Sequence, residues 1–184
     1  MSGVTVSTGS TLTDSDLTQL EGTITNNGTI TNPNNTLQVT GGDVTLTGGG
    51  TVTMSSDAFF NESTGGLTLH NVNNLIEGSG QLGQNGLALD NQSGGTVNAN
   101  VSGQTLTLNG GGAVTNAGLL TATGGGIMTI DNNVTNTGAN ITANGGTVNL
   151  QNANTVTGGT LNTSGGGVMN GQNVTPGARS PTPT

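Results

Sequence analysis

The sequence predicts an all-β protein, a single-stranded parallel β-solenoid with three short strands in each coil of about 20 residues. Three observations predict it: Gly, Thr and Asn make up over half of the 184 residues, short apolar-x-apolar segments recur at a nearly constant interval, and Gly or Asn clusters separate them. With aromatic residues at 1%, the chain cannot build an ordinary core. It must bury apolar surface by stacking repeats.

The clearest repeat is an apolar-x-apolar motif that recurs about every 20 residues. Its period-two alternation is typical of a half-buried strand, while the abundance of Thr, Val, Gly and Asn disfavours helix. The repeat predicts one buried core column, formed by the second apolar residue of each motif: Leu46, Leu69, Leu89, Leu108, Ile130 and Leu150.

Two further strand tracks share the same period. One track contains Val97, Leu120, Ile141 and Leu161, and the other contains Val114, Val134 and Val156. Successive coils of such a solenoid lie about 4.8 Å apart, the usual distance between neighbouring strands.

Asn residues follow the first track and predict a ladder at one corner. Corner residues must accept positive φ or close their own turns through side-chain hydrogen bonds, which Gly and Asn do well. We expect side-chain amides to bond from coil to coil, with an interruption at Gly110. The predicted corner ladder consists of Asn71, Asn91, Asn132 and Asn152.

The chain divides into three parts by regularity. Residues 1–43 are expected to form irregular N-terminal coils, and residues 44–170 the regular solenoid. Residues 171–184 contain Pro176, Pro181 and Pro183, which cannot donate in a strand ladder, so a flexible Pro-rich tail is expected.

Charge and composition disfavour several kinds of partner. The net charge is −8 and Arg179 is the one residue that is Lys or Arg, so we expect no nucleic-acid binding and no attraction to anionic lipid. No apolar run is long enough for a spanning helix and no signal peptide is recognisable, so membrane insertion is not expected. The absence of Cys is compatible with export, in which case this chain is a fragment.

Candidate catalytic groups are few and dispersed, so no enzyme activity and no cofactor are expected. Asp90 and Asp131 are expected at one corner, two coils or about 9 to 10 Å apart, a separation that could admit an inverting carboxylate pair. No Lys, Arg or aromatic residue accompanies them to grip a substrate. Asp90 is therefore interpreted as a turn residue, and His70 beside it as a solvated ion-pair partner.

Motifs for calcium, sugar and ice binding are incomplete. The repeated G-G-x-G-x-D motif is missing, and Asp131-Asn-Asn133 supplies too few charged oxygens for calcium. Phe59 and Phe60 should face opposite sides of a strand, with packing as their role. Thr-x-Thr recurs at nine places but on different tracks, so an ice-binding solenoid stays an alternative, as does a β-helical carbohydrate-active enzyme.

The segments Leu89-Asp-Asn-Gln-Ser-Gly-Gly-Thr-Val-Asn-Ala99 and Val114-Thr-Asn-Ala-Gly-Leu-Leu-Thr-Ala122 resemble the repeats of filamentous haemagglutinin-like exoproteins. That family repeats roughly L-D-N-x-G-x-L-x-A about every twenty residues. The resemblance implies a right-handed parallel β-helix in an adhesin shaft, secreted or at the bacterial surface. The N-terminal secretion domain of the family is not recognisable here, and an autotransporter passenger would look alike.

The ends of the predicted solenoid carry no large hydrophobic or charged cap. Exposed strand edges can pair with another copy, so end-to-end self-association is expected. A host or surface receptor is expected for an adhesin, but no motif identifies it.

Overall fold

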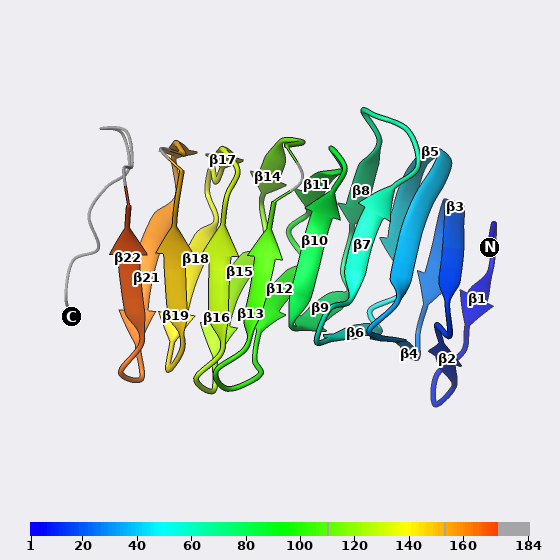
Figure 1. The fold of residues 1–184 in the computed structure, drawn as a ribbon, viewed down its shortest axis with the longest axis horizontal. Helices are drawn as coiled ribbons and strands as arrows, with labels where there is room; N and C mark the ends of the chain where they lie inside the picture. The colour runs from blue at the N-terminus through cyan, green and yellow to red at the C-terminus, as the bar shows by residue number, and fades with distance from the viewer. Residues whose placement is uncertain (110, 153, 173–184) are drawn as a thin grey trace.

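The computed structural model describes residues 1–172 apart from residues 110 and 153, and every regular element in that part of the chain is a β-strand. The strands form three stacked columns, which we call faces A, B and C, and the chain visits each face once per coil. The coils stack along the long axis, with β1 at one end and β22 at the other (Figure 1). The expected parallel β-solenoid with three strands per coil is confirmed.

Face A is a sheet of eight strands, all paired in parallel. Its inward positions 12, 30, 52, 76, 97, 120, 141 and 161 are direct partners in successive coils. The coils therefore have about 20 residues each, as the repeat predicts. The strands are β2 (Thr11–Thr13), β4 (Thr29–Pro33), β6 (Thr51–Ser55), β9 (Leu75–Gly78), β12 (Thr96–Ala99), β15 (Leu119–Thr123), β18 (Asn140–Asn144) and β21 (Thr160–Ser164).

Faces B and C belong to one continuous sheet because two long strands, β3 (Leu17–Asn26) and β5 (Thr36–Thr47), bend across both. Face B continues with β7 (Phe59–Glu62), β10 (Gly80–Gln84), β13 (Thr105–Leu108), β16 (Ile127–Ile130), β19 (Thr147–Leu150) and β22 (Val168–Gly171). Face C contains β1 (Thr5–Val6), β8 (Thr68–Asn71), β11 (Ala88–Asn91), β14 (Val114–Asn116), β17 (Val134–Thr135) and β20 (Val156–Thr157).

Alternating side chains from all three faces fill a thin core of Val, Leu, Ile, Ala and Met. Phe60 is buried while Phe59 faces outward and is half-buried, as their adjacency predicts. Each fully buried Val, Leu or Ile contributes about 1.5–3 kcal/mol. Gly78 lets the coils approach closely: it has φ +120°, and a Cβ there would lie 1.8 Å from the carbonyl oxygen of Met54.

The predicted core column is wrong in its connectivity, although all six of its residues are buried. Leu69 and Leu89 are partners on face C, and Leu46 lies on the same face but opposite Asn71. Leu108, Ile130 and Leu150 are partners on face B.

The repeat merges a face C column and a face B column into one predicted column, because the step from face C to face B is nearly as long as one coil. Leu89 is followed on face C by Val114, while Leu108 is preceded on face B by Leu82. The step from Leu89 to Leu108 is close to one coil in length, although it moves from one face to another. The other two predicted tracks are confirmed as parts of face A and face C.

The first 43 residues form coils that continue the same three faces. β3 and β5 pair over both of their halves, with one irregularity between Leu20 and Gly22. The expected tail falls largely on residues 173–184, which lie outside the described residues.

Candidate functional site

A ladder of buried asparagines runs along the inner edge of face C. Asn71 donates its side-chain amide to Asn91 Oδ1 (2.9 Å), Asn91 to Asn116 Oδ1 (2.8 Å), and Asn116 to Asn136 Oδ1 (2.7 Å). All four side chains are at most 1% exposed. All three amide-to-amide bonds run from one coil to the following coil, so the ladder has one direction.

The ladder also ties down the turn from face C to face A. Asn71 donates to the carbonyl oxygen of Asn74 (3.0 Å) and accepts from its backbone N–H (3.0 Å), and Asn136 donates to the carbonyl oxygen of Ala139 (3.2 Å). Buried backbone groups at a corner need such partners because water cannot reach them. The ladder therefore supplies hydrogen-bond partners to corner backbone groups that neither water nor the thin apolar core can satisfy.

Half of the predicted ladder is correct. Asn71 and Asn91 belong to it, but Asn132 and Asn152 do not. Asn132 lies after face B and donates to the carbonyl oxygen of Gly112 (2.7 Å), and Asn152 is exposed with φ +60°. The true members, Asn116 and Asn136, share an apolar-x-Asn pattern with Leu69-His-Asn71 and Leu89-Asp-Asn91, and this signal could have found them.

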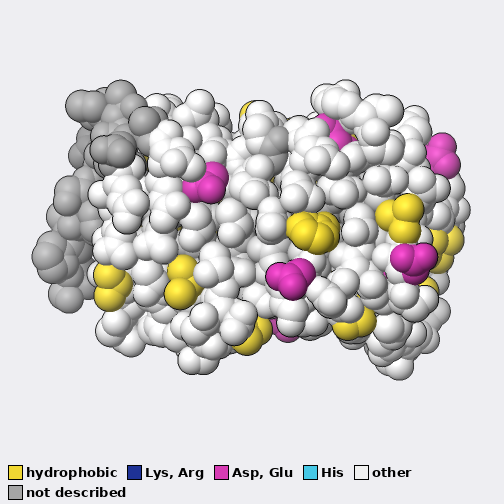
Figure 2. Space-filling view, in the orientation of Figure 1, with side chains coloured by type: hydrophobic (Ala, Val, Ile, Leu, Met, Phe, Trp, Pro, Cys, Tyr) yellow, Lys and Arg dark blue, Asp and Glu magenta, His cyan; other side chains and the backbone are white. Residues whose placement is uncertain are grey.

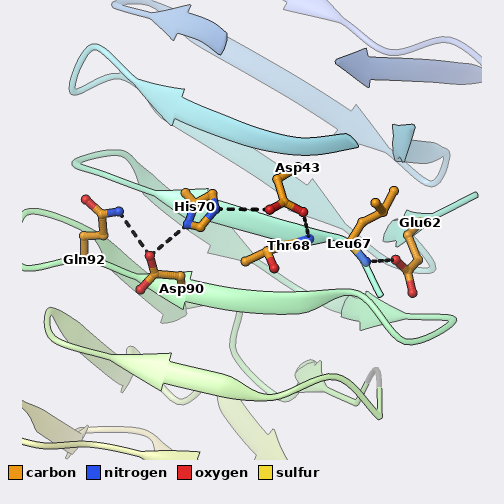
Figure 3. A network of polar contacts seen from close by, with 7 residues as sticks. All are labelled: Asp43, Glu62, Leu67, Thr68, His70, Asp90 and Gln92. Carbon is orange, nitrogen blue, oxygen red and sulfur yellow. Dashed lines mark hydrogen bonds and ion pairs between the residues drawn. The ribbon is translucent and has the colours of Figure 1, made fainter. Parts of the chain in front are cut away.

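His70 lies between two carboxylates on the outer side of face C (Figure 3). Its Nδ1 is 2.9 Å from Asp90 Oδ2, and its Nε2 is 3.7 Å from Asp43 Oδ2. Asp90 also accepts from Gln92 Nε2 (3.1 Å), and Asp43 accepts from the backbone N–H of Thr68 (2.8 Å). The expected contact of His70 with Asp90 is confirmed, since the two residues are direct partners in register.

The His70 cluster is partly open to solvent, with side-chain exposures of 29% for Asp90, 31% for His70 and 53% for Asp43. Exposed ion pairs of this kind contribute about 0–1 kcal/mol. An imidazole between carboxylates can exchange protons, but the polar contacts of the cluster are with Gln92 and a strand backbone. This arrangement fits a surface polar network that links three coils.

The expected pairing of Asp90 and Asp131 at one corner is wrong. Asp90 lies inside strand β11 on face C, opposite His70 and Thr115, so its interpretation as a turn residue is also wrong. Asp131 follows the face B strand β16, and its N–H donates to the carbonyl oxygen of Leu108. The error follows from the merged column, and it removes the geometry that an inverting carboxylate pair would need.

Glu62 is a structural carboxylate that the sequence did not indicate. It is 1% exposed, and its two oxygens accept from the backbone N–H groups of Gly66 (3.2 Å) and Leu67 (2.6 Å). The carboxylate thereby closes the loop between β7 and β8 (Figure 3). No local motif marks it, because its partners are backbone groups.

Within residues 1–109, 111–152 and 154–172, no group of three His, Asp or Glu side chains is placed to hold a metal ion. The same part of the chain has no helix that is long and apolar enough to cross a membrane. On the face shown in Figure 2, the Asp and Glu side chains are scattered singly over an otherwise uncharged surface that also carries single hydrophobic side chains.

Threonine pairs line up on the outer side of face A in the first three coils. Thr11, Thr29 and Thr51 are partners in one rank, and the residues two positions later form a second rank, Thr13, Thr31 and Thr53. The expectation that no face repeats Thr-x-Thr in successive coils is therefore wrong for this segment. The ranks end at the fourth coil, where Leu75 and Glu77 take these positions.

Neither a protein-family model, nor a curated protein, nor a solved structure matches this chain. The fold by itself defines the class, a single-stranded parallel β-solenoid.

Proposed function

We propose that the solenoid is a passive, extracellular shaft in a bacterial surface or secreted adhesin-like exoprotein, without a catalytic role. The observation that carries this proposal is the parallel pairing that continues on all three faces from β1 to β22. Neighbouring strands lie about 4.8 Å apart, so the eight stacked strands of face A make a rod a few nanometres long. Hydrogen bonds in every coil and the Asn ladder inside them resist bending of such a rod.

Surface chemistry and the repeat motif support the same proposal. Charged residues are 5% of the chain, so the rod offers little attraction to charged molecules. The similarity of residues 89–122 to haemagglutinin-like repeats supports a location outside the cell. Export by two-partner secretion or as an autotransporter passenger would suit this fold.

Single-molecule pulling tests the shaft. With handles at both ends of the full chain, we expect stepwise release of coils, each step adding about 6–7 nm for a coil of about 20 residues. Extension without resolvable steps would contradict the proposal, because such a chain could not transmit force as a rod.

A second candidate, ice binding, is favoured by the two threonine ranks on face A. Thr pairs two residues apart on strands about 4.8 Å apart form a regular grid of methyl and hydroxyl groups, which suits an ordered water lattice. Thermal hysteresis of the full chain, abolished by Thr31→Lys at the centre of the grid, would support it. Absence of hysteresis and of crystal shaping in the unaltered chain would exclude it.

A further inference from the structure

The corner after face B holds an unusual set of oxygens. Six buried side-chain nitrogen or oxygen atoms in the described part of the chain have no hydrogen-bond partner, and three of them are Asn109 Oδ1, Asp131 Oδ1 and Asn132 Oδ1. Leu108 and Ile130 are direct partners, so Asn109 and Asp131, which follow them, lie one coil apart, about 4.8 Å along the axis. Asn132 is the next residue.

The same corner is hollowed. A hollow of about 310 Å³ is lined by Gly111, Gly112 and Ala113 from one coil, by residues 131–133 from the next, and by Asn154. Asn132 is 5% exposed. Its nitrogen donates to Gly112 O (2.7 Å), which fixes the orientation of the amide, while its oxygen has no partner.

Neighbouring amide nitrogens are committed elsewhere. Asn109 donates to Gln81 Oε1 (2.9 Å), and Asn154 donates to the carbonyl oxygen of Ile130 (3.0 Å). Burying an acceptor without a donor costs about 1–3 kcal/mol, and more for a charged group. Three such acceptors at one corner call for a positive or donating ligand.

Simple occupants satisfy the corner incompletely. A water molecule donates two hydrogen bonds, and a proton on Asp131 satisfies one oxygen. A hard cation can bond to several such oxygens at once, and Ca²⁺ prefers carboxylate, amide and carbonyl oxygens in irregular geometry.

We propose that the corner formed by Asn109, Asp131 and Asn132 is a calcium-binding site, completed by water. The proposal is independent of the shaft function. In the sequence, the segment Asp131-Asn-Asn133 supplies one carboxylate, which by itself is too few ligands for calcium. The fold adds an amide oxygen from the preceding coil. One carboxylate with neutral ligands suits weak affinity, with a Kd on the order of 10⁻⁴–10⁻³ M, as in extracellular modules.

Thermal unfolding of the full chain, followed by far-UV circular dichroism, tests the site. After treatment with a chelator, about 10 mM CaCl₂ should raise the Tm by about 3–6 °C for a Kd near 1 mM. Asp131→Asn keeps the side-chain shape and should abolish this shift. Asp57→Asn, which alters an exposed carboxylate, should retain it in full.

Isothermal titration with CaCl₂ provides a second readout, with heat of binding expected for the unaltered chain and for Asp57→Asn but not for Asp131→Asn. An equal Tm shift in Asp131→Asn, or an equal shift from NaCl at matched ionic strength, would overturn the proposal. The absence of both shift and heat in the unaltered chain would also overturn it.

Discussion

The Asn ladder allows a sharp test at its second member, Asn91. Asn91→Ala removes the donor to Asn116 Oδ1 (2.8 Å) and the acceptor for Asn71 Nδ2 (2.9 Å). Asn71 keeps its bond to the Asn74 carbonyl, but Asn116 Oδ1 loses its amide donor in a side chain that is 1% exposed. The two lost amide-to-amide hydrogen bonds at about 1 kcal/mol each and one orphaned acceptor at about 1–3 kcal/mol predict a loss of about 3–5 kcal/mol in the free energy of unfolding. Asn91→Ala also removes the long bonds from Asn91 to the carbonyl oxygens of Gly95 and Leu119 (3.3 Å each).

Urea unfolding followed by far-UV circular dichroism measures this loss. The matched control is Asn149→Ala on face B, whose side chain accepts from Asn170 in an exposed pair (2.9 Å). A surface change of this kind should cost less than about 0.5 kcal/mol. Asn91→Asp should be worse than Asn91→Ala, because it sets a carboxylate oxygen against Asn116 Oδ1. Equal stability of the Asn91→Ala and Asn149→Ala variants would refute the stabilising role of the ladder.

Three further outcomes follow from packing and burial, each measured by the same unfolding assay. Gly78→Ala should prevent stable folding or cost more than about 3 kcal/mol, because at φ +120° its Cβ would overlap the Met54 carbonyl oxygen. Leu69→Ala should cost about 2–5 kcal/mol, since the side chain is 0% exposed. Burial raises the pKa of the Asp131 carboxyl above its ordinary 3.8. In the presence of a chelator, the contribution of Asp131 to the free energy of unfolding is therefore fully present below pH 3.8 and is lost as the pH rises through the raised pKa. Asp131→Asn should flatten this decline in stability.

The Gly78 and Leu69 changes have matched controls on the same scaffold. Gly103 has φ +70° and no atom within 4 Å of an added Cβ, so Gly103→Ala should cost only about 1 kcal/mol of backbone strain. Leu17, at 50% exposure, should tolerate Ala with little loss. A Gly78→Ala protein as stable as Gly103→Ala would contradict the close approach of the coils.

The sequence was sufficient to predict the architecture because period-two alternation and a repeat of roughly 20 residues are local signals. It also placed Val97, Leu120 and Ile141 in one column, and His70 beside Asp90, correctly. Each of these segments has a single segment of matching pattern about one coil away in the sequence, so its partner is unambiguous.

Register between faces could not be predicted in the same way. The distance from one face to another within a coil varies with corner length, and the coils differ in length, since Thr11 pairs with Thr29 but Thr51 with Leu75. A step from face C to face B can then imitate a full coil, as it does between Leu89 and Leu108. The cluster of oxygens around Asp131 could not be predicted for the same reason, because Asn109 comes close to Asp131 only through the pairing of β13 with β16.

The single direction of the Asn ladder makes the coil a modular unit of length. If residues 92–116 were excised as a block, Asn91 would take the position of Asn116 and could donate to Asn136 Oδ1 in its place. Insertions and deletions of whole coils therefore preserve the chain of amides, whereas a partial insertion would break it. A protein built in this way can change its reach in discrete increments over evolutionary time without redesigning its interior.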